Sequence, residues 1–423
     1  MDIEPTSAGT GPGDARIAVV GGGLAGLAVA LGVARTGRRV LLFDGDEARE
    51  DARTTAMLRP TIDMLRGWGV WADIEPESAP LRVMRIIDGS RRLVRAPTVS
   101  FSAQEIGEDA FGWNVPNAAA AQALRRAIDD EPTIERIPAR VDAIDLTADR
   151  ARLVFGDDEW VVPLVVGADG GRSIVRRSAN IGVWERAYPQ TAIVTTFTHE
   201  LPHGDVSTEF HTEHGPATQV PLPGDRSSLV WVTAPAEAQE LAALAPERLS
   251  ERIEDRLAHL LGRVTVDGAV GQFPMRTLRA SAYAGQRAAL VGEAVHAFPP
   301  IGAQGFNLTM RDVRTLIELQ RDAADPGAAP LLDAYDRERS RDAATRSLAV
   351  DVANRTLLDD GLAAQIGKAM GLGALRSIPQ LREVVMREGF QPNLLRRRTG
   401  SDVLSGALRR LREADARFRA ARG

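Results

Sequence analysis

The apolar residues of the chain follow two different patterns. Near the N-terminus, short uninterrupted apolar runs flank a helix-like stretch, which is typical of buried parallel strands joined by a helix. We expect strands at Arg16 to Val20 and at Arg39 to Phe43, with a helix between them that runs to about Thr36. This order predicts a Rossmann-like α/β domain.

The middle of the chain alternates polar and apolar residues instead, which is the pattern of half-buried strands. Strands are expected at Ala192 to Thr198, Val206 to Phe210, Ala217 to Leu222 and Ser228 to Thr233. A helix is expected at Pro246 to Gly262, and the chain from about residue 326 onward is predicted to be helical. We therefore predict an α+β second lobe, with the substrate between its sheet and the first domain.

The domain boundaries follow from these patterns. At about 150 residues per domain, a chain of 423 residues is expected to form two or three lobes. We predict a disordered extension (1–15), a discontinuous first domain (16–75, 100–180 and 275–325), a β-rich substrate domain (76–99 and 181–274) and C-terminal helices (326–423). Thr133 to Phe155 is expected to add a β-hairpin to the first domain.

Composition removes several kinds of chemistry. The chain has no cysteine, which excludes disulfides, thiol nucleophiles and cysteine-ligated zinc or iron–sulfur clusters. Its net charge of −5 gives no reason to expect a nucleic-acid partner. The first residues lack the basic start and apolar centre of a signal peptide, so we expect a cytoplasmic protein. Redox chemistry would therefore need a bound organic cofactor or a metal held by oxygen and nitrogen ligands.

A glycine-rich turn connects the first strand to the helix that follows it. Gly21, Gly23 and Gly26 have the G-x-G-x-x-G spacing, and Asp44 ends the second strand. Gly21 permits the tight turn, Gly23 lets the backbone approach a pyrophosphate, and Gly26 lets the helix pack against the strands. Asp44 is expected to accept a hydrogen bond from a ribose hydroxyl. The motif predicts a dinucleotide site, but it does not separate FAD from NAD.

Two later segments each combine a buried strand with a polar turn. The first, VVGADGGRS at 165–173, carries Asp169. The second, ALVGEAVHAFPPIGAQGFN at 289–307, has an acid and a rigid Pro-Pro before the glycines that open a helix to about Gln320. Such an arrangement can place a carboxylate on a polyol and a helix N-terminus against a ring that carries negative charge.

These three segments, in this order and spacing, resemble the single-component FAD-dependent aromatic hydroxylases. The resemblance runs from about Arg16 to about Arg355 and is greatest to the ubiquinone-biosynthesis branch, which DARTTA at 51–56 and PLPGDRSSLVW at 221–231 also match. It implies the p-hydroxybenzoate hydroxylase type of fold. It also implies FAD as the cofactor, O2 as co-substrate, and NAD(P)H or a protein electron donor as the reductant.

The resemblance implies two sets of site residues. Pro299, Pro300 and Gly302 shape the wall where the substrate meets the flavin, and no general base is assigned. The cofactor is held by Gly21, Gly23, Leu24, Ala25, Gly26, Asp44, Arg53, Asn117, Asp169, Gly170, Gly292, Glu293, Gly302, Gly305, Phe306 and Asn307. Among these, Arg53 is expected to reach the pyrophosphate and Glu293 the ribityl chain. Asp169 is expected to contact both FAD and the side from which the reductant approaches.

The implied reaction is hydroxylation of a phenolic ring through a flavin hydroperoxide, with the protein supplying position, exclusion of water and stabilisation of charge. The implied substrate is a polyprenylated ubiquinone precursor. Three alternatives stay open: a hydroxylase of a small soluble aromatic compound, a flavin-binding assembly subunit of a biosynthetic complex, and an NAD-dependent dehydrogenase. The segment from Gly292 to Asn307 disfavours the last of these.

The histidines raise the question of a metal. Four of them fall within sixteen residues: His199, His203, His211 and His214. Their spacing fits no fixed helical ligand pair, so no metal site is predicted. His296, inside the third motif, is expected to be a hydrogen-bonded structural histidine rather than the catalytic base.

The C-terminal tail has a composition of its own. Gln391 to Gly423 carries nine Arg against three acids, and Val403 to Phe418 is expected to form a basic amphipathic helix. Such a helix either lies on the anionic inner face of a membrane or docks on the same chain or on a biosynthetic complex.

Overall fold

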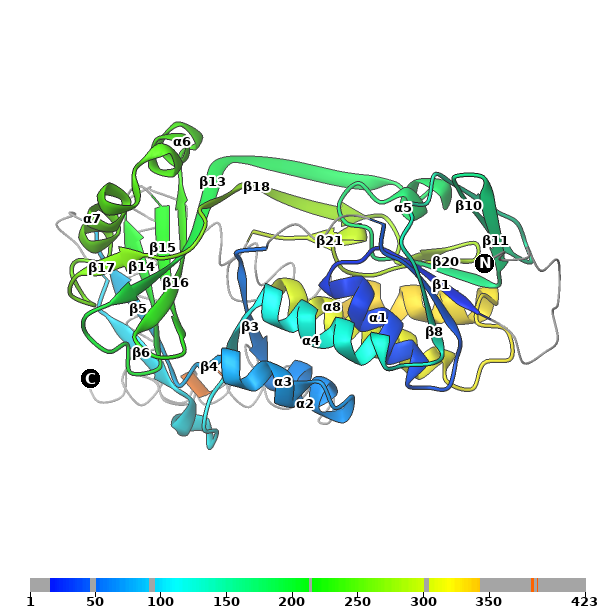
Figure 1. The fold of residues 1–423 in the computed structure, drawn as a ribbon, viewed down its shortest axis with the longest axis horizontal. Coiled ribbons are helices and arrows are strands. Elements are labelled where there is room, and N and C mark those ends of the chain that lie inside the picture. The colour runs from blue at the N-terminus through cyan, green and yellow to red at the C-terminus, as the bar shows by residue number, and fades with distance from the viewer. Residues whose placement is uncertain are drawn as a thin grey trace, which may run out of the picture.

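The computed structural model describes residues 16–45, 51–90, 96–212, 215–299, 304–342, 382, 383 and 386. Figure 1 shows an elongated molecule with two halves. One half carries a parallel sheet and its helices, the other carries a larger sheet with two helices on its far side, and two long strands run between the halves.

The first half contains a six-stranded sheet of order β19-β20-β12-β1-β2-β8. Its strands are β1 (Ile17–Val20), β2 (Val40–Phe43), β8 (Ile134–Ile137), β12 (Leu164–Gly167), β19 (Ala284–Gly285) and β20 (Ala288–Leu290). Only the edge pair β19–β20 is antiparallel. The predicted strand–helix–strand order at the N-terminus is confirmed, with the helix α1 at Leu24–Ala34.

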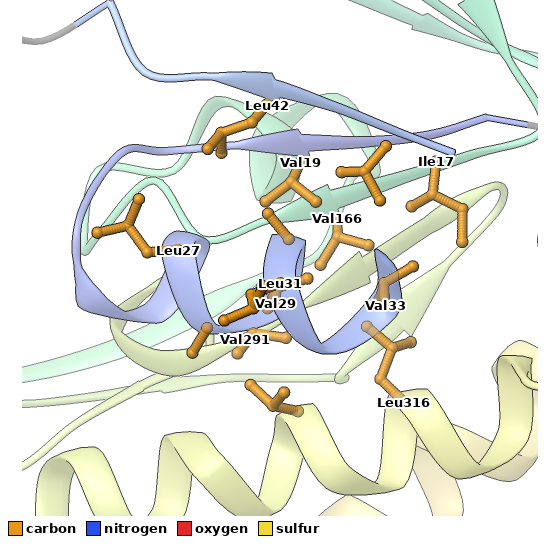
Figure 2. Close-up of a cluster of buried hydrophobic side chains, with 14 of the residues drawn as sticks. Ile17, Val19, Leu27, Val29, Leu31, Val33, Leu42, Val166, Val291 and Leu316 are labelled. Atoms are coloured by element: carbon orange, nitrogen blue, oxygen red, sulfur yellow. The ribbon is translucent and has the colours of Figure 1, made fainter. Parts of the chain in front are cut away.

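Helix α1 forms the centre of this half because it is apolar on every side. Figure 2 shows it between the sheet, represented by Val19 and Leu42, and Leu316 of α8 (Gln304–Gln320). All residues from Gly26 to Ala34 are buried. The apolar run at the N-terminus is therefore core, and no helix in the described part of the chain is long and apolar enough to cross a bilayer.

Smaller elements complete this half. The helices are α2 (Arg59–Gly67), α3 (Trp71–Ile74), α4 (Asn117–Asp129), α5 (Ile174–Ser178) and the short 3-10 turns η1 (Glu75–Glu77) and η3 (Gly292–Ala294). A third 3-10 turn, η2 (Ala103–Ile106), packs with the sheet of the second half. One three-stranded sheet has the order β3-β7-β4, formed by Thr54–Leu58, Gly112–Pro116 and Ala79–Pro80. A second has the order β11-β10-β9, formed by Asp158–Val162, Ala151–Phe155 and Ala143–Leu146.

The hairpin expected within Thr133 to Phe155 is formed by β9 and β10. β8, at the start of this stretch, joins the six-stranded sheet as a parallel edge strand, with Ile134 opposite Val40. The antiparallel partners are β9 with β10 and β10 with β11. Pairing between strands nearly a hundred residues apart leaves no mark in the local alternation.

The second half is a nine-stranded sheet of order β21-β18-β13-β16-β15-β14-β5-β6, with β17 paired to β13. Its strands are β5 (Val83–Asp88), β6 (Val99–Ser102), β13 (Val183–His199), β14 (Val206–Thr212), β15 (Gly215–Leu222), β16 (Arg226–Thr233), β17 (Val264–Val266), β18 (Gly271–Ala280) and β21 (His296–Ala297). The four predicted strands are present, and β6, β18 and β21 carry the sheet beyond the predicted substrate domain.

Two helices pack on the far side of this sheet, α6 (Pro235–Ala243) and α7 (Pro246–Arg256). The helix predicted to reach Gly262 ends earlier because Ala258 and His259 have positive φ values of 51° and 53°. Helical residues cannot adopt that conformation. Residues 329–342 are helical as expected, whereas the N-terminal extension and the basic tail from Gln391 to Gly423 lie outside the described residues.

Candidate functional site

The glycine-rich turn between β1 and α1 is packed tightly at two positions and open at the third. A Cβ on Gly26 would lie 1.8 Å from the carbonyl oxygen of Gly21, and one on Gly21 would lie 2.4 Å from that of Ala168. Gly21 also has a φ of +123°. A Cβ on Gly23 would meet nothing within 4 Å. The turn therefore needs its first and last glycines for packing, while Gly23 leaves space for a ligand beside the backbone.

The three sequence motifs meet at this turn. A Cβ on Gly21 would lie 3.0 Å from the backbone nitrogen of Asp169. On the other side, a Cβ on Gly292 would lie 3.2 Å from both the Cβ of Ala25 and the Oγ1 of Thr309 in the first turns of α8. The start of α1, beginning at Leu24, thus adjoins the Asp169 turn, the Gly292 turn and the start of α8.

Asp169 is a half-buried acid of the site. Its Oδ2 accepts a hydrogen bond from the backbone N–H of Ile174 at 2.6 Å, at the start of α5. Its Oδ1 is buried and has no hydrogen-bond partner within the described chain. Burial raises the pKa of this carboxyl, and hydrogen bonds from Ser173 and the backbone offset that rise only in part. An orphaned buried acceptor beside an open glycine turn fits a hydroxyl or N–H donor of a bound cofactor. Gly170, which follows it, takes a positive φ of 76°.

Asp44 lies at the end of β2, beside the glycine turn, as predicted. A Cβ on Gly22 would be 2.6 Å from the Cβ of Asp44. One carboxylate oxygen, Oδ2, accepts hydrogen bonds from Nη2 and Nε of Arg136 at 2.7 and 3.1 Å. The side chain is only 8% exposed, so Arg136 fixes its direction before any ribose is bound.

Arg53 and Asn117 meet at Asp51. The Asp51 carboxylate accepts hydrogen bonds from Nε and Nη2 of Arg53 at 2.7 and 2.8 Å, and from Nδ2 of Asn117 at 2.8 Å. Burial pushes the pKa of Asp51 up, but its hydrogen bonds to Arg53 and Asn117 and the Arg53 charge bring it below the ordinary value. The Asp51 hydrogen bond, with a further contribution from the charge of Glu293, raises the pKa of Arg53. The guanidinium lies 5.1 Å above the Phe273 ring of β18, so Arg53 links the two halves.

Three buried side chains, Asp312, His296 and Arg339, support the Gly292 turn, and we call them the Asp312 hub. The Asp312 carboxylate lies 2.7 Å from Nε2 of His296 and 2.7 Å from Nε of Arg339, and it also accepts the Gly292 N–H at 3.2 Å. The three side chains are at most 4% exposed. His296 is therefore the hydrogen-bonded structural residue that the sequence predicts. Glu293, by contrast, is exposed beside this buried support.

A second tie joins the two carboxylate turns. Arg176 of α5 is buried and donates hydrogen bonds from Nη1 to the carbonyl of Ala294 and from Nη2 to the carbonyl of Gly171, both at 2.7 Å. Desolvation lowers the pKa of Arg176, and the nearby Asp169 charge opposes that effect. One guanidinium thus fixes the Asp169 turn relative to the Glu293 turn.

At the start of α8 the predicted residues divide into two kinds. Gly305 is exposed and Phe306 half-buried, while the Asn307 side chain is buried. Asn307 uses its amide inside the protein: Oδ1 accepts from the Leu58 N–H at 2.9 Å and the Thr61 hydroxyl at 2.8 Å, and Nδ2 donates to the Ala56 carbonyl at 2.8 Å. It ties α8 to β3 and α2.

The predicted substrate wall is described in part. Pro299 is buried, whereas Pro300 and Gly302 lie outside the described residues. The histidines of the second half are engaged with the sheet: His199 contacts the Leu201 carbonyl and the Ser227 hydroxyl, and His203 the Leu222 carbonyl. The described chain holds no group of three potential metal ligands, and His214 lies outside it.

Sequence reasoning missed Asp51, Arg176, Asp312 and Arg339. Asp51 stood within the quoted DARTTA segment but was given no role. The other three lie on helices, where a single buried charge inside an amphipathic pattern looks like an ordinary surface residue.

Comparisons with known proteins agree with this geometry. Residues 14–348 match the family model described as FAD binding domain. The chain is 33% identical over 395 residues to the ubiquinone hydroxylase UbiL of Rhodospirillum rubrum, covering 90% of this chain and 91% of that protein. It is 32% identical over 340 residues to the 3-demethoxyubiquinol 3-hydroxylase of Escherichia coli, covering 77% and 85% of the two chains.

Solved structures show the same fold. The crystal structure of p-nitrophenol 4-monooxygenase from Pseudomonas putida is similar with a TM-score of 0.73 at 19% identity, covering 88% of this chain and 96% of that chain. The predicted fold, an FAD domain of the p-hydroxybenzoate hydroxylase type with a β-sheet substrate domain, is thereby confirmed. The open Gly23, the orphaned Asp169 oxygen and the converging turns fit FAD. NAD(P)H is the typical reductant of proteins in this family. The chain therefore belongs to the FAD-binding-domain family and is an FAD-dependent monooxygenase, which is an oxidoreductase that uses O2.

Proposed function

We propose that the protein hydroxylates the phenolic ring of a polyprenylated ubiquinone precursor. The observation that carries this proposal is the similarity to the ubiquinone hydroxylase of Rhodospirillum rubrum over nine-tenths of both chains. The sheet of the second half supports it, because the side of that sheet nearest the FAD domain carries an apolar cluster of Ala192, Val232, Met275 and Phe273.

The cofactor would be held by the turns that meet at α1. We assign its ADP part to Gly21, Gly23, Gly26 and Asp44, with the N-terminus of α1 at Leu24 and Ala25 directed at the phosphates. Its ribityl chain and ring fall to Gly292, Glu293 and the start of α8 at Gly305 and Phe306. Bound FAD supplies the redox chemistry and the reaction with O2.

The chain's own residues supply position and charge. Asp169 presents a buried acceptor on the side where a reductant would approach, and the Asp312 hub and Arg176 keep its turn in register with Glu293. Arg53 is held by Asp51 over Phe273, which places a cation where the two halves meet. Asn307 fixes the start of α8 against β3 and α2.

Quinone lipids from cells that lack this chain test the proposal. Mass spectrometry should find a polyprenyl phenol that lacks one oxygen atom, and reintroducing the wild-type chain should remove it. The Asp169→Ala variant should fold as the wild type does without restoring hydroxylation. Restoration by Asp169→Ala would favour an assembly subunit, and an unchanged ubiquinone pool would favour a small soluble aromatic substrate.

The tail adds a second part to the proposal. A lipid-tailed substrate is met at a membrane surface, and the basic amphipathic sequence from Val403 to Phe418 has the composition of a surface-binding helix. The full chain should sediment with vesicles containing anionic lipid, and Arg409→Glu combined with Arg410→Glu should reduce that binding. Equal sedimentation of both proteins would favour docking on a partner or on the same chain.

A further inference from the structure

The two faces of the nine-stranded sheet differ in what covers them. One face packs against α6 and α7 through a core cluster that takes alternate residues of the central strands, among them Ile193, Phe197, Phe210, Leu229 and Trp231. Since side chains of a strand alternate between faces, the residues between these point the other way. We call that side the inner face.

The inner face is directed at the FAD-binding half. The Thr54 hydroxyl of β3 lies 2.9 Å from the Ser228 hydroxyl of β16, and Nδ2 of Asn114 in β7 donates to the Pro221 carbonyl at 2.8 Å. Arg53, beside the cofactor turns, stacks on Phe273 of the same face. In Figure 1 the helices α6 and α7 lie on the opposite side of the sheet from the FAD half.

One row across the inner face is apolar except near its middle. The register pairs run from Val194 to Val230, Thr218, Glu209, Ile86 and Val99. The four central members of this row are half-buried, whereas the matching residues on the other face are mostly buried. A carboxylate within an apolar row of a large sheet is costly unless a partner or a ligand satisfies it.

Glu209 has one close titratable neighbour. Nε2 of His211, two residues further along β14, lies 2.8 Å from Oε1 of Glu209. The side chain of Glu209 is 25% exposed and that of His211 is 19% exposed. The nearest acid beyond them, Asp88, is committed elsewhere, since its oxygens accept the backbone N–H groups of Ser90 and Ala96 at 3.0 and 2.7 Å. Glu209 therefore keeps acceptor capacity toward the space in front of the sheet.

We infer that Glu209 is the substrate-recognition residue of this monooxygenase: it accepts the hydrogen bond of the phenolic hydroxyl, with the His211 ring beside its carboxylate. Ile86, next to Glu209 in the row, and Val230, on the far side of Thr218, would contact the ring and the first prenyl carbons. This inference rests on the proposed function, because it takes a prenylated phenol as the ligand. It assigns recognition of the phenolic hydroxyl to a residue of the sheet. Glu209 on β14 lies two strand spacings, about 10 Å, from Val230 of β16.

A pair of ligands that differ only in the phenolic proton tests the inference. The FAD-loaded full-length protein is titrated with 2-prenylphenol and with its methyl ether, 2-prenylanisole, and binding is followed by the change in flavin absorbance. The wild type should bind the phenol about tenfold or more tightly than the ether, since a charge-assisted hydrogen bond is lost with the ether. Glu209→Ala should bind the two alike, and His211→Leu should lower the ratio in part.

The matched control is Glu240→Ala, which removes an exposed carboxylate of α6 on the far side of the sheet and should keep the wild-type ratio. FAD content and the thermal midpoint of each variant check folding independently of ligand binding. An unchanged phenol-to-ether ratio in Glu209→Ala, with the wild type turning over the phenol, would overturn the inference and leave the proposed function intact. A wild type that binds neither ligand would contradict the proposed function itself.

Discussion

The two large sheets of the molecule use their faces in different ways. In the parallel sheet, the central strands β1, β2, β12 and β20 are buried at every residue because other elements cover both faces there, whereas the edge strand β8 is partly exposed. In the nine-stranded sheet, β5 is half-buried throughout and β15 alternates. The first sheet is a scaffold that presents turns at its strand ends, whereas the second offers one face as a binding surface.

This difference explains where the polar residues lie. In the FAD half, the charged groups that matter follow strands or sit under turns, as Asp44, Asp169 and the Asp312 hub do. In the second half, polar side chains stand within the strands themselves, such as Gln219 and Ser227, which hydrogen-bond to one another at 2.9 Å. Both side chains are buried, and their hydrogen bond offsets the cost of that burial.

The largest expected effect comes from the support of the FAD half. Asp312→Ala removes the carboxylate partner of Arg339, which is 3% exposed, and should lower the free energy of unfolding by about 3–5 kcal/mol. Asp342→Ala is the matched control: it removes a second carboxylate 2.8 Å from Arg339 that is 26% exposed, and should cost about 1 kcal/mol or less. Chemical denaturation of both variants measures the difference. Equal losses would show that the hub is not the support of the Gly292 turn.

The glycine turn gives the next effect. Gly26→Ala places a Cβ 1.8 Å from a backbone oxygen and should destabilise the FAD-free protein by about 1–3 kcal/mol or more. Gly23→Ala has open space and should leave that stability nearly unchanged while weakening FAD binding. Denaturation without FAD and fluorescence titration with FAD separate the two outcomes. A Gly23→Ala protein with wild-type FAD affinity would remove Gly23 from the cofactor site.

Asp169 and Asp51 should respond to pH in opposite directions. Because the pKa of Asp169 is raised in the folded state, ionisation of its carboxyl lowers the stability of the FAD-free protein. This loss develops as pH rises from about 4 through the folded-state pKa, and it then stays constant. Asp169→Asn removes this cost. The stability of the wild type relative to Asp169→Asn should therefore fall over that pH range. A flat difference would contradict the burial of the carboxylate.

Asp51 should give the smallest effect. Its lowered pKa contributes stability that is present above pH of about 4 and is lost as pH falls through the folded-state pKa. The side chains of Asp51 and Arg53 are 28% and 43% exposed. Asp51→Asn should therefore lower the free energy of unfolding by no more than about 1 kcal/mol at neutral pH. Thermal unfolding of the FAD-free protein at neutral pH and near pH 3 measures this difference. A larger gap at acid pH would contradict the assignment.

The parts that sequence could predict are those with local signals. The glycine spacing, Asp44 and Asp169 were placed by the strand and turn patterns around them, and the structure brings these segments together. The first part of β13 was missed because VWERAYPQ is polar and contains Pro189, which reads as a loop. It is a strand because β18, ninety residues later, pairs with it, and the register shifts between Ala187 and Thr191, on either side of the proline.

The site shows the same limit. The motif predicts Asn307 beside the flavin, but it gives no sign that the amide holds β3 and α2. Arg53 was expected at the pyrophosphate, and in the described fold its guanidinium lies on Asp51 and Phe273. A motif gives the neighbourhood of a side chain, while the direction of its hydrogen bonds depends on elements far away in sequence.

The most direct test of the central claim is a turnover of the purified, FAD-loaded protein with a prenylated phenol and a reductant under ¹⁸O2. Mass spectrometry of the product should find a single ¹⁸O atom on the aromatic ring, with none when ¹⁶O2 is used in H2¹⁸O. Consumption of reductant and O2 without labelled product, for every prenylated phenol tried, would contradict the assignment of this chain as a hydroxylase of ubiquinone precursors.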